Sequence, residues 1–353
     1  MKSFIIFLLL LTVVFGCTKK KEDDTQTTTG CDRSAGHRRG FAFSPFGFPS
    51  TYDNSTAFFQ AAENFGNTSI MWNGNWRDSL ASSGTLPSAP VSITQNTSYC
   101  YLGYSVFGWR SGSTLYLDHP ASSVNNWTNS YTQAAMKNML VQFAQTYQPK
   151  YLFIGNENDF FYVDYPSNYA SWISFYETAY DAIKAVSPDT LVGVVFNYEH
   201  MSGHGSLNAW TTSYWGAYTA HNASKIDIVG ITTYPFFDNA NASSIPSTYY
   251  NDLFSHIGTK PIAITETGWS SAHATGYTPS WNASTTQQTD FISKLSTLLS
   301  GRDVRFVNWL YLNTMTNYCS SCDAWKIFGN VSLVDSSGVE KPAFAAWKSF
   351  TLQ

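Results

Sequence analysis

Short apolar runs alternate along the chain with longer segments in which apolar residues recur every three or four positions. Eight apolar runs of four to eight residues predict buried strands at 40–46, 69–72, 101–107, 151–154, 191–196, 226–233, 261–266 and 304–311. Helical spacing of apolar residues, clearest at 130–147 and 167–186, predicts helices at 58–65, 130–147, 167–186, 207–220, 247–257, 285–299 and 341–351.

Strands that alternate with helices pair in parallel through right-handed crossovers. Eight such units predict an α/β fold of the (β/α)₈ (TIM) barrel type, whose active site lies at the C-terminal ends of the strands. The residues between the second and third strands, 78–99, are rich in Ser, Pro and Gly. We therefore expect the second helix of the barrel to be weak or replaced by a loop.

Polar side chains follow several of the predicted strands. Asn156 and Glu157 end the fourth strand, Tyr234 follows the sixth, Glu266 ends the seventh, and Trp309 lies near the end of the eighth. A carboxylate at the end of a buried strand is costly unless it is paired or used. Because the fourth and seventh strands face each other across a barrel mouth, Glu157 and Glu266 are expected to form an acid/base pair, although two structural carboxylates remain the alternative.

The runs Gly155-Asn156-Glu157 and Ile264-Thr-Glu-Thr-Gly-Trp269 resemble those of the retaining (β/α)₈ glycoside hydrolases of clan A. This clan includes endo-β-1,4-galactanases, β-mannanases and β-1,3-glucanase-like enzymes. The resemblance implies that Glu157 is the general acid/base and Glu266 the nucleophile. It also implies that Asn156 binds the sugar 2-hydroxyl, that Tyr234 holds the nucleophile, and that Trp309 forms the floor of the −1 subsite.

The composition favours a carbohydrate partner and excludes some others. Aromatic residues reach 17%, with 12 Trp, and rings in a groove commonly grip sugar faces. Trp72, Trp76, Trp109 and Trp269 lie near predicted strand ends, where each either stacks on a sugar or packs in the core. The net charge is −4 without a basic patch, so nucleic acid is not an expected partner. We expect a monomer that binds poly- or oligosaccharide.

The first residues have the pattern of an export signal. Lys2 precedes an apolar stretch at 4–15, which is too short to span a bilayer, and Val14-Phe15-Gly16-Cys17 resembles a bacterial lipobox. We expect a lipoprotein signal peptide at 1–16, lipidated Cys17 with a flexible tether at 17–35, and the catalytic barrel at 36–353. The expected location is the bacterial cell envelope, lipid-anchored to the outer membrane or cell surface; a simple cleaved signal and secretion are the alternative.

Four further cysteines remain if Cys17 carries lipid. Cys319 and Cys322 form a Cys-x-x-Cys pair in a predicted loop, for which a local disulfide is favoured over a redox pair or a zinc site. A bridge between Cys31 and Cys100 stays open. Glu199, His200 and His204 could form a metal site, since the two histidines are spaced as ligands on a helix would be, but the glycines around His204 favour a loop and a subsite or surface role. No metal or cofactor is expected.

Together these features predict a retaining, endo-acting glycoside hydrolase, which cleaves internal bonds of a β-linked polysaccharide by double displacement. Two alternatives use the same scaffold. One is a surface lipoprotein that binds glycan without cleaving it, and the other is a transglycosidase acting on cell-wall β-glucan.

Overall fold

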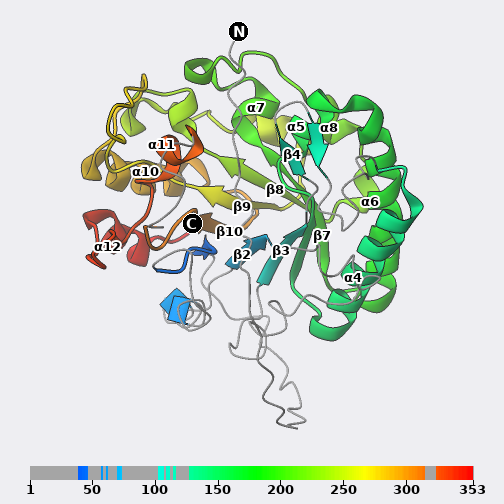
Figure 1. Ribbon diagram of the computed structural model, residues 1–353. Helices are drawn as coiled ribbons and strands as arrows, with labels where there is room; N and C mark the ends of the chain where they lie inside the picture. The colour runs from blue at the N-terminus through cyan, green and yellow to red at the C-terminus, as the bar shows by residue number, and fades with distance from the viewer. Residues whose placement is uncertain are drawn as a thin grey trace.

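Eight parallel strands close into a barrel, which confirms the predicted fold class (Figure 1). The computed structural model describes residues 39–46, 57–58, 61–62, 70–73, 102–106, 109–111, 114–116, 127–314 and 323–352. In barrel order the strands are β1 (Arg39–Ala42), β10 (Val304–Trp309), β9 (Ile262–Thr267), β8 (Ile228–Thr233), β7 (Leu191–Asn197), β6 (Tyr151–Ile154), β3 (Leu102–Val106) and β2 (Ile70–Asn73), which returns to β1. A hairpin of β4 (Trp109–Ser111) and β5 (Thr114–Tyr116) stands apart from the barrel sheet.

Helices surround the strands, with α4 and α6 on one side of the barrel and α10 and α12 on the opposite side (Figure 1). The helices are α4 (Ser130–Tyr147), α5 (Asn158–Asp164), α6 (Pro166–Val186), α7 (Tyr198–Ser202), α8 (Gly216–Thr219), α9 (Asn251–Ile257), α10 (Thr285–Leu298), α11 (Asp323–Phe328) and α12 (Pro342–Ser349). Short 3₁₀ turns lie at η1 (Ser206–Asn208), η2 (Ala223–Lys225), η3 (Pro235–Phe237) and η4 (Ala242–Ser244). Within the described ranges, none of the helices is long and apolar enough to cross a membrane.

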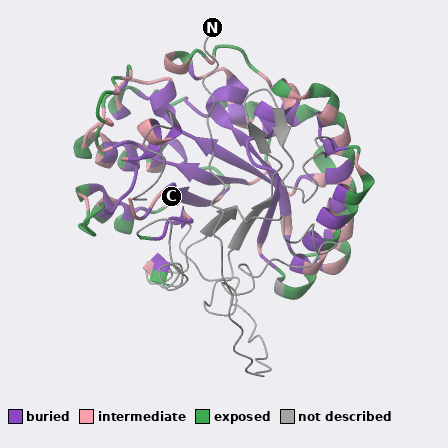
Figure 2. Cartoon of the chain, in the orientation of Figure 1, coloured by how far each residue is buried: buried purple, intermediate pink, exposed green. Residues whose placement is uncertain are grey.

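The strands have two buried faces, as their nearly continuous apolar sequences require. The barrel interior is filled by Tyr151, Phe153, Val195, Ile228, Ala263 and Phe306. Intervening residues such as Leu152, Val194 and Ile264 point outward and join the larger cluster beneath the helices. Figure 2 shows the consequence: strands β6 to β10 are almost entirely buried, whereas the surrounding helices expose their outer faces.

The predicted helix at 207–220 is wrong. Its place is taken by η1, an antiparallel bridge between Gly205 and Trp210, and the four-residue α8. The run Thr211-Thr212-Ser213 between them has low helix propensity, which favours an irregular segment.

Other boundaries also differ from the prediction. Glu199 and His200, expected in a loop, lie on the short helix α7, because the Asn197 side chain caps it by accepting from the His200 backbone N–H at 3.0 Å. The helix predicted at 247–257 begins only at Asn251, and the eighth strand ends at Trp309. The missing second barrel helix concerns residues that lie outside the described ranges.

Candidate active site

A tight turn at the end of β6 places the first candidate glutamate. Gly155 has φ +93°, and a Cβ there would lie 2.7 Å from Asn158 and Trp172 side-chain atoms, so the turn requires glycine. Glu157 follows in the left-handed region, with φ 50° and ψ 50°, immediately before α5. Non-glycine residues in this region are uncommon and cluster at functional sites.

Two donors from neighbouring strands bind Glu157, which is only 6% exposed. Asn197 Nδ2, at the end of β7, donates to Glu157 Oε1 at 3.1 Å. Thr232 Oγ1, on β8, donates to the same oxygen at 2.8 Å. The carboxylate is therefore fixed by groups from β7 and β8, the next two strands around the barrel from β6.

An irregularity in β9 brings the second glutamate to the barrel mouth. Ile231 of β8 is paired with Ile264, but the next residue, Thr232, is paired with Glu266, so Thr265 is an extra residue. Side chains alternate between the two faces of a strand, so one extra residue moves the Glu266 side chain to the opposite face. Glu266 is thereby paired with Thr232, the residue that binds Glu157. Without this bulge, Glu266 would point the same way as Ile262 and Ile264, toward the helices.

Glu266 is 3% exposed and is also held by two donors. Tyr234 Oη, just after β8, donates to Glu266 Oε2 at 3.1 Å. The Asn156 side chain provides a second hydrogen bond. Asn156, which precedes Glu157 in the sequence, thus bonds Glu266. This hydrogen bond links the end of β6 to the end of β9.

The two carboxyl groups interact electrostatically. Burial raises the pKa of Glu266 well above its usual value, and the charge of Glu157 raises it further, against the hydrogen bonds from Tyr234 and Asn156. Burial and then the Glu266 charge likewise raise the pKa of Tyr234, which keeps its hydroxyl protonated as a donor. A pair of this kind holds one proton and one negative charge over a wide pH range.

A third buried glutamate, Glu199 on α7, bonds the backbone of Tyr234. Its Oε2 accepts from the Tyr234 backbone N–H at 2.9 Å, and its Oε1 accepts from Thr233 Oγ1 at 2.6 Å and from Tyr249 Oη at 3.0 Å. Burial raises the pKa of Glu199 to about 7, although these hydrogen bonds oppose the shift. From the sequence, Glu199 was considered as a metal ligand beside His200 and His204, with a subsite or surface role favoured.

The two histidines considered as metal ligands contact carboxylates instead. His200 Nδ1 lies 2.7 Å from Asp159 Oδ2, and the His200 ring stacks on Phe160 with 3.9 Å between centroids. His204 Nδ1 lies 3.9 Å from Asp238 Oδ2. In the described part of the chain, no group of three or more His, Cys, Asp or Glu side chains is arranged to hold a metal ion.

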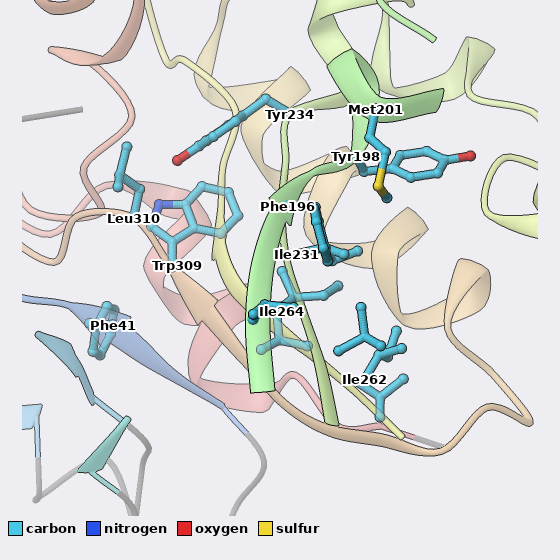
Figure 3. Packing of buried hydrophobic residues seen from close by; sticks show 14 of the residues in the cluster. Phe41, Phe196, Tyr198, Met201, Ile231, Tyr234, Ile262, Ile264, Trp309 and Leu310 are labelled. Carbon is cyan, nitrogen blue, oxygen red and sulfur yellow. The ribbon is translucent and has the colours of Figure 1, made fainter. Parts of the chain in front are cut away.

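The two described tryptophans of the predicted site are fully buried. Trp309 Nε1 donates to the Val331 carbonyl at 2.8 Å, and its ring packs against Trp347 of α12. Figure 3 shows this ring among residues of the buried cluster that also includes Tyr234. Trp269 Nε1 donates to the Asn282 carbonyl at 2.8 Å. Protein covers both rings here, so sugar stacking on either stays a prediction.

Several predicted features fall on residues outside the described ranges. These are Cys17, Cys31, Cys100, Cys319, Cys322 and Trp76, together with the signal peptide and tether. Of Trp72 and Trp109 only the backbone is described, in β2 and β4.

Sequence reasoning missed the donors that hold the carboxylates, chiefly Asn197 and Thr232. Asn197 ends an apolar run and could have been noticed as another polar strand end. Thr232 could not, because a threonine inside an apolar strand looks like any other β-branched residue.

The chain was compared with known families and structures. The sequence model of glycosyl hydrolase family 53 matches residues 117–309, more than half of the chain and the part that contains both glutamates. Among curated protein sequences, none matches significantly.

Solved structures share the fold at low sequence identity. An exo-β-1,4-mannosidase from Opitutaceae bacterium strain TAV5 superposes with a TM-score of 0.62 at 15% identity, over 89% of this chain and 59% of that one. GH5_18 from Streptomyces cattleya, solved with GlcNAc, gives 0.63 at 14% identity, over 89% and 80%. A Bifidobacterium dentium β-glucuronidase gives 0.55 at 12%, over 89% and 46%. The chain thus spans less than two thirds of the first and third of these proteins.

Proposed function

The chain belongs to glycosyl hydrolase family 53, and on that premise we propose that it cleaves β-linked polysaccharide with retention of anomeric configuration. Glu157 is the general acid/base and Glu266 the nucleophile. The observation that carries this proposal is the buried, electrostatically coupled pair of glutamates at the ends of β6 and β9. A retaining glycosidase needs one protonated and one ionised carboxyl group on either side of the scissile bond.

In the first step, the one proton that the coupled pair holds lies on Glu157, and an oxygen of the ionised Glu266 attacks the anomeric carbon while the bond to the leaving oxygen breaks. Glu157 gives its proton to that oxygen, so the leaving sugar departs as an alcohol. The Tyr234 hydroxyl, which donates to Glu266 Oε2, orients the attacking carboxylate. The Asn156 amide, which bonds Glu266, also binds the 2-hydroxyl of the same sugar in this proposal.

In the second step, the ionised Glu157 takes a proton from water, and the resulting hydroxide attacks the anomeric carbon. The bond to Glu266 breaks, and both carboxyl groups return to their starting states. Two inversions give net retention. Thr232 and Asn197, which donate to Oε1 of Glu157, hold this carboxyl group in place through both steps.

The family and the resemblance support linear β-1,4-galactan as the first substrate to test, with cleavage inside the chain. The test is reducing-sugar release by the purified protein from β-1,4-galactan, β-1,4-mannan, β-1,3-glucan and β-1,4-glucan. Glu157→Ala and Glu266→Ala serve as inactive comparisons, and Glu340→Gln, an exposed glutamate paired with Lys348, as the control.

We expect oligosaccharides from one polysaccharide and a loss of about 10³-fold or more in both alanine variants, since each removes a group that acts directly on the reacting atoms. Saturable binding of polysaccharide without product would favour the glycan-binding alternative. Products longer than the substrate, formed when acceptor sugar is added, would favour transglycosylation.

The N-terminal pattern supports a second, separate proposal, that Cys17 carries lipid and anchors the enzyme to the cell envelope. Expression of the full chain in bacteria followed by fractionation tests it. Cys17→Ser is expected to move the protein out of the membrane fraction; an unchanged distribution would contradict the anchor.

A further inference from the structure

Three consecutive residues at the end of β8 each donate to a different buried glutamate. Thr232 Oγ1 binds Glu157 at 2.8 Å, Thr233 Oγ1 binds Glu199 at 2.6 Å, and Tyr234 Oη binds Glu266 at 3.1 Å. Thr232 and Tyr234 serve the two reacting carboxylates. Glu199 holds the residue between them.

Glu199 also holds the backbone of this segment. Its Oε2 accepts from the Tyr234 N–H at 2.9 Å, and Tyr249 Oη donates to its Oε1 at 3.0 Å. The Thr233 carbonyl is held by Thr267 Oγ1 at 2.7 Å, from the residue that follows Glu266. The Thr233–Tyr234 peptide is therefore fixed from α7 on one side and from β9 on the other.

The surroundings of Glu199 are costly for a purely structural group. It is fully buried, and among the described residues the groups that bond it are two hydroxyls and two backbone amides, those of Tyr234 and of Glu199 itself, all uncharged. An ionised carboxylate without a cation costs folding free energy that an apolar side chain would not. In its ionised form, Glu199 makes charge-assisted hydrogen bonds. Such bonds are shorter and stronger than neutral ones and fix the geometry of their donors more closely.

We propose that Glu199 is a positioning residue for the reaction, which holds the end of β8 so that the Tyr234 hydroxyl keeps the nucleophile Glu266 in its attacking orientation. Glu199 does not touch the substrate. It acts through Tyr234, and this inference rests on the function proposed above.

A double-mutant cycle between Glu199 and Tyr234 tests the proposal. Glu199→Gln keeps the volume and can still bond the Tyr234 N–H through its oxygen, but it lacks the charge. Tyr234→Phe removes only the hydroxyl. The two single variants, the double variant and the exposed control Glu340→Gln are compared by kcat and KM on soluble β-1,4-galactan, with folding checked by circular dichroism.

If Glu199 acts through the Tyr234 hydroxyl, its removal matters only while that hydroxyl is present. We expect Glu199→Gln to lower kcat about 10-fold with KM within about twofold, and Tyr234→Phe to lower kcat about 10- to 100-fold, as expected for loss of a hydrogen bond to a charged group. The double variant should lie within about twofold of Tyr234→Phe. Multiplied losses in the double variant, or wild-type kcat in Glu199→Gln, would overturn the proposal.

Thr233→Val provides a second route if Glu199→Gln does not fold. It keeps the shape and the carboxylate but removes the 2.6 Å bond, and the same non-additivity with Tyr234→Phe is expected. Glu266→Ala separates this inference from the proposed function. Full activity in Glu266→Ala would overturn both, whereas an inactive Glu266→Ala with multiplied losses in the cycle would overturn only the role of Glu199.

Discussion

At the scale of single residues, the site consists of carboxylates that are buried but never without hydrogen bonds. Glu157, Glu199 and Glu266 each accept at least two hydrogen bonds. Each of the three accepts at least one from the segment Thr232–Tyr234 at the end of β8. Burial raises the pKa of Glu199 and Glu266. The left-handed backbone of Glu157 adds a strained residue to the same place.

The coupling of Glu157 and Glu266 predicts a specific pH dependence. The active form has one proton on the pair, so kcat/KM falls at low pH when both are protonated and at high pH when both are ionised. Burial and mutual repulsion place the high-pH loss above the ordinary carboxyl range. Glu157→Gln, assayed with an aryl glycoside whose leaving group needs no proton, should lose the alkaline limb and keep the acid limb.

The control for this profile is Glu340→Gln, which should keep both limbs. An alkaline limb that persists unchanged in Glu157→Gln would show that it reports another group.

At the scale of elements, the bulge in β9 determines which face of the strand carries Glu266. Separately, Gly193 and Gly230 allow β6, β7 and β8 to approach one another closely. A Cβ at Gly193 of β7 would lie 2.0 Å from the Ile228 backbone oxygen of β8. A Cβ at Gly230 of β8 would meet only side-chain atoms, of Val195 at 2.8 Å and Phe153 at 3.0 Å. Backbone in a closed barrel cannot move aside as a side chain can.

Alanine at these two positions should therefore destabilise the barrel to different extents. Gly193→Ala is expected to cost about 3 kcal/mol or more, and Gly230→Ala about 1–3 kcal/mol, as overpacking usually does. Urea unfolding midpoints measure both, with Ser174→Ala on the exposed face of α6 as a control near zero. A Gly193→Ala variant as stable as wild type would contradict the close strand approach.

The elements also show what sequence could and could not predict. The barrel strands are recognisable because buried parallel strands are continuous apolar runs, and α4 and α6 because their apolar spacing persists over 18 and 21 residues. The short helices α5, α7 and α8 depend on tertiary contacts, and α7 also on its Asn197 cap, which a residue pattern does not contain. The bulge is equally invisible in Ile262–Thr267, although it orients the nucleophile.

At the scale of the whole molecule, buried ionisable groups make stability depend on pH in opposite directions. Glu199 has a folded pKa of about 7, above its usual value, so the folded state binds the extra proton and stability falls as pH rises from about 4.5 to 7. Burial lowers the pKa of His221 to about 3, so the unfolded state binds the extra proton and stability rises between about 3 and 6.5. The two effects oppose each other where the ranges overlap.

Glu199→Gln should remove one of these effects. Relative to wild type, the variant is expected to gain stability as pH rises from 4.5 to 7, by about 3 kcal/mol for a shift of this size. Thermal unfolding of both proteins across this range measures the difference, in which the contribution of His221 cancels. A difference that does not change with pH would contradict a raised pKa for Glu199.

The sequence identified some residues of the candidate site but not the residues that hold them. The strand-end glutamates and Tyr234 were found because each is a polar residue after an apolar run, and the resemblance to clan A hydrolases implied their individual roles. The donors that hold Glu157 lie far from it in the sequence, Asn197 by 40 positions and Thr232 by 75, and only the folded barrel brings these together. The sugar itself depends on loops, whose sequence does not translate into specificity.

The central claim is that Glu266 attacks and Glu157 transfers the proton, and chemical rescue with azide tests it most directly. Glu157→Ala and Glu266→Ala are incubated with azide and an activated aryl β-glycoside of the sugar that the wild type cleaves, and the configuration of the glycosyl azide is read by NMR. Glu157→Ala should give the β-azide, formed from the covalent intermediate, and Glu266→Ala the α-azide, formed by direct displacement. The opposite assignment, or the same azide from both variants, would contradict the account.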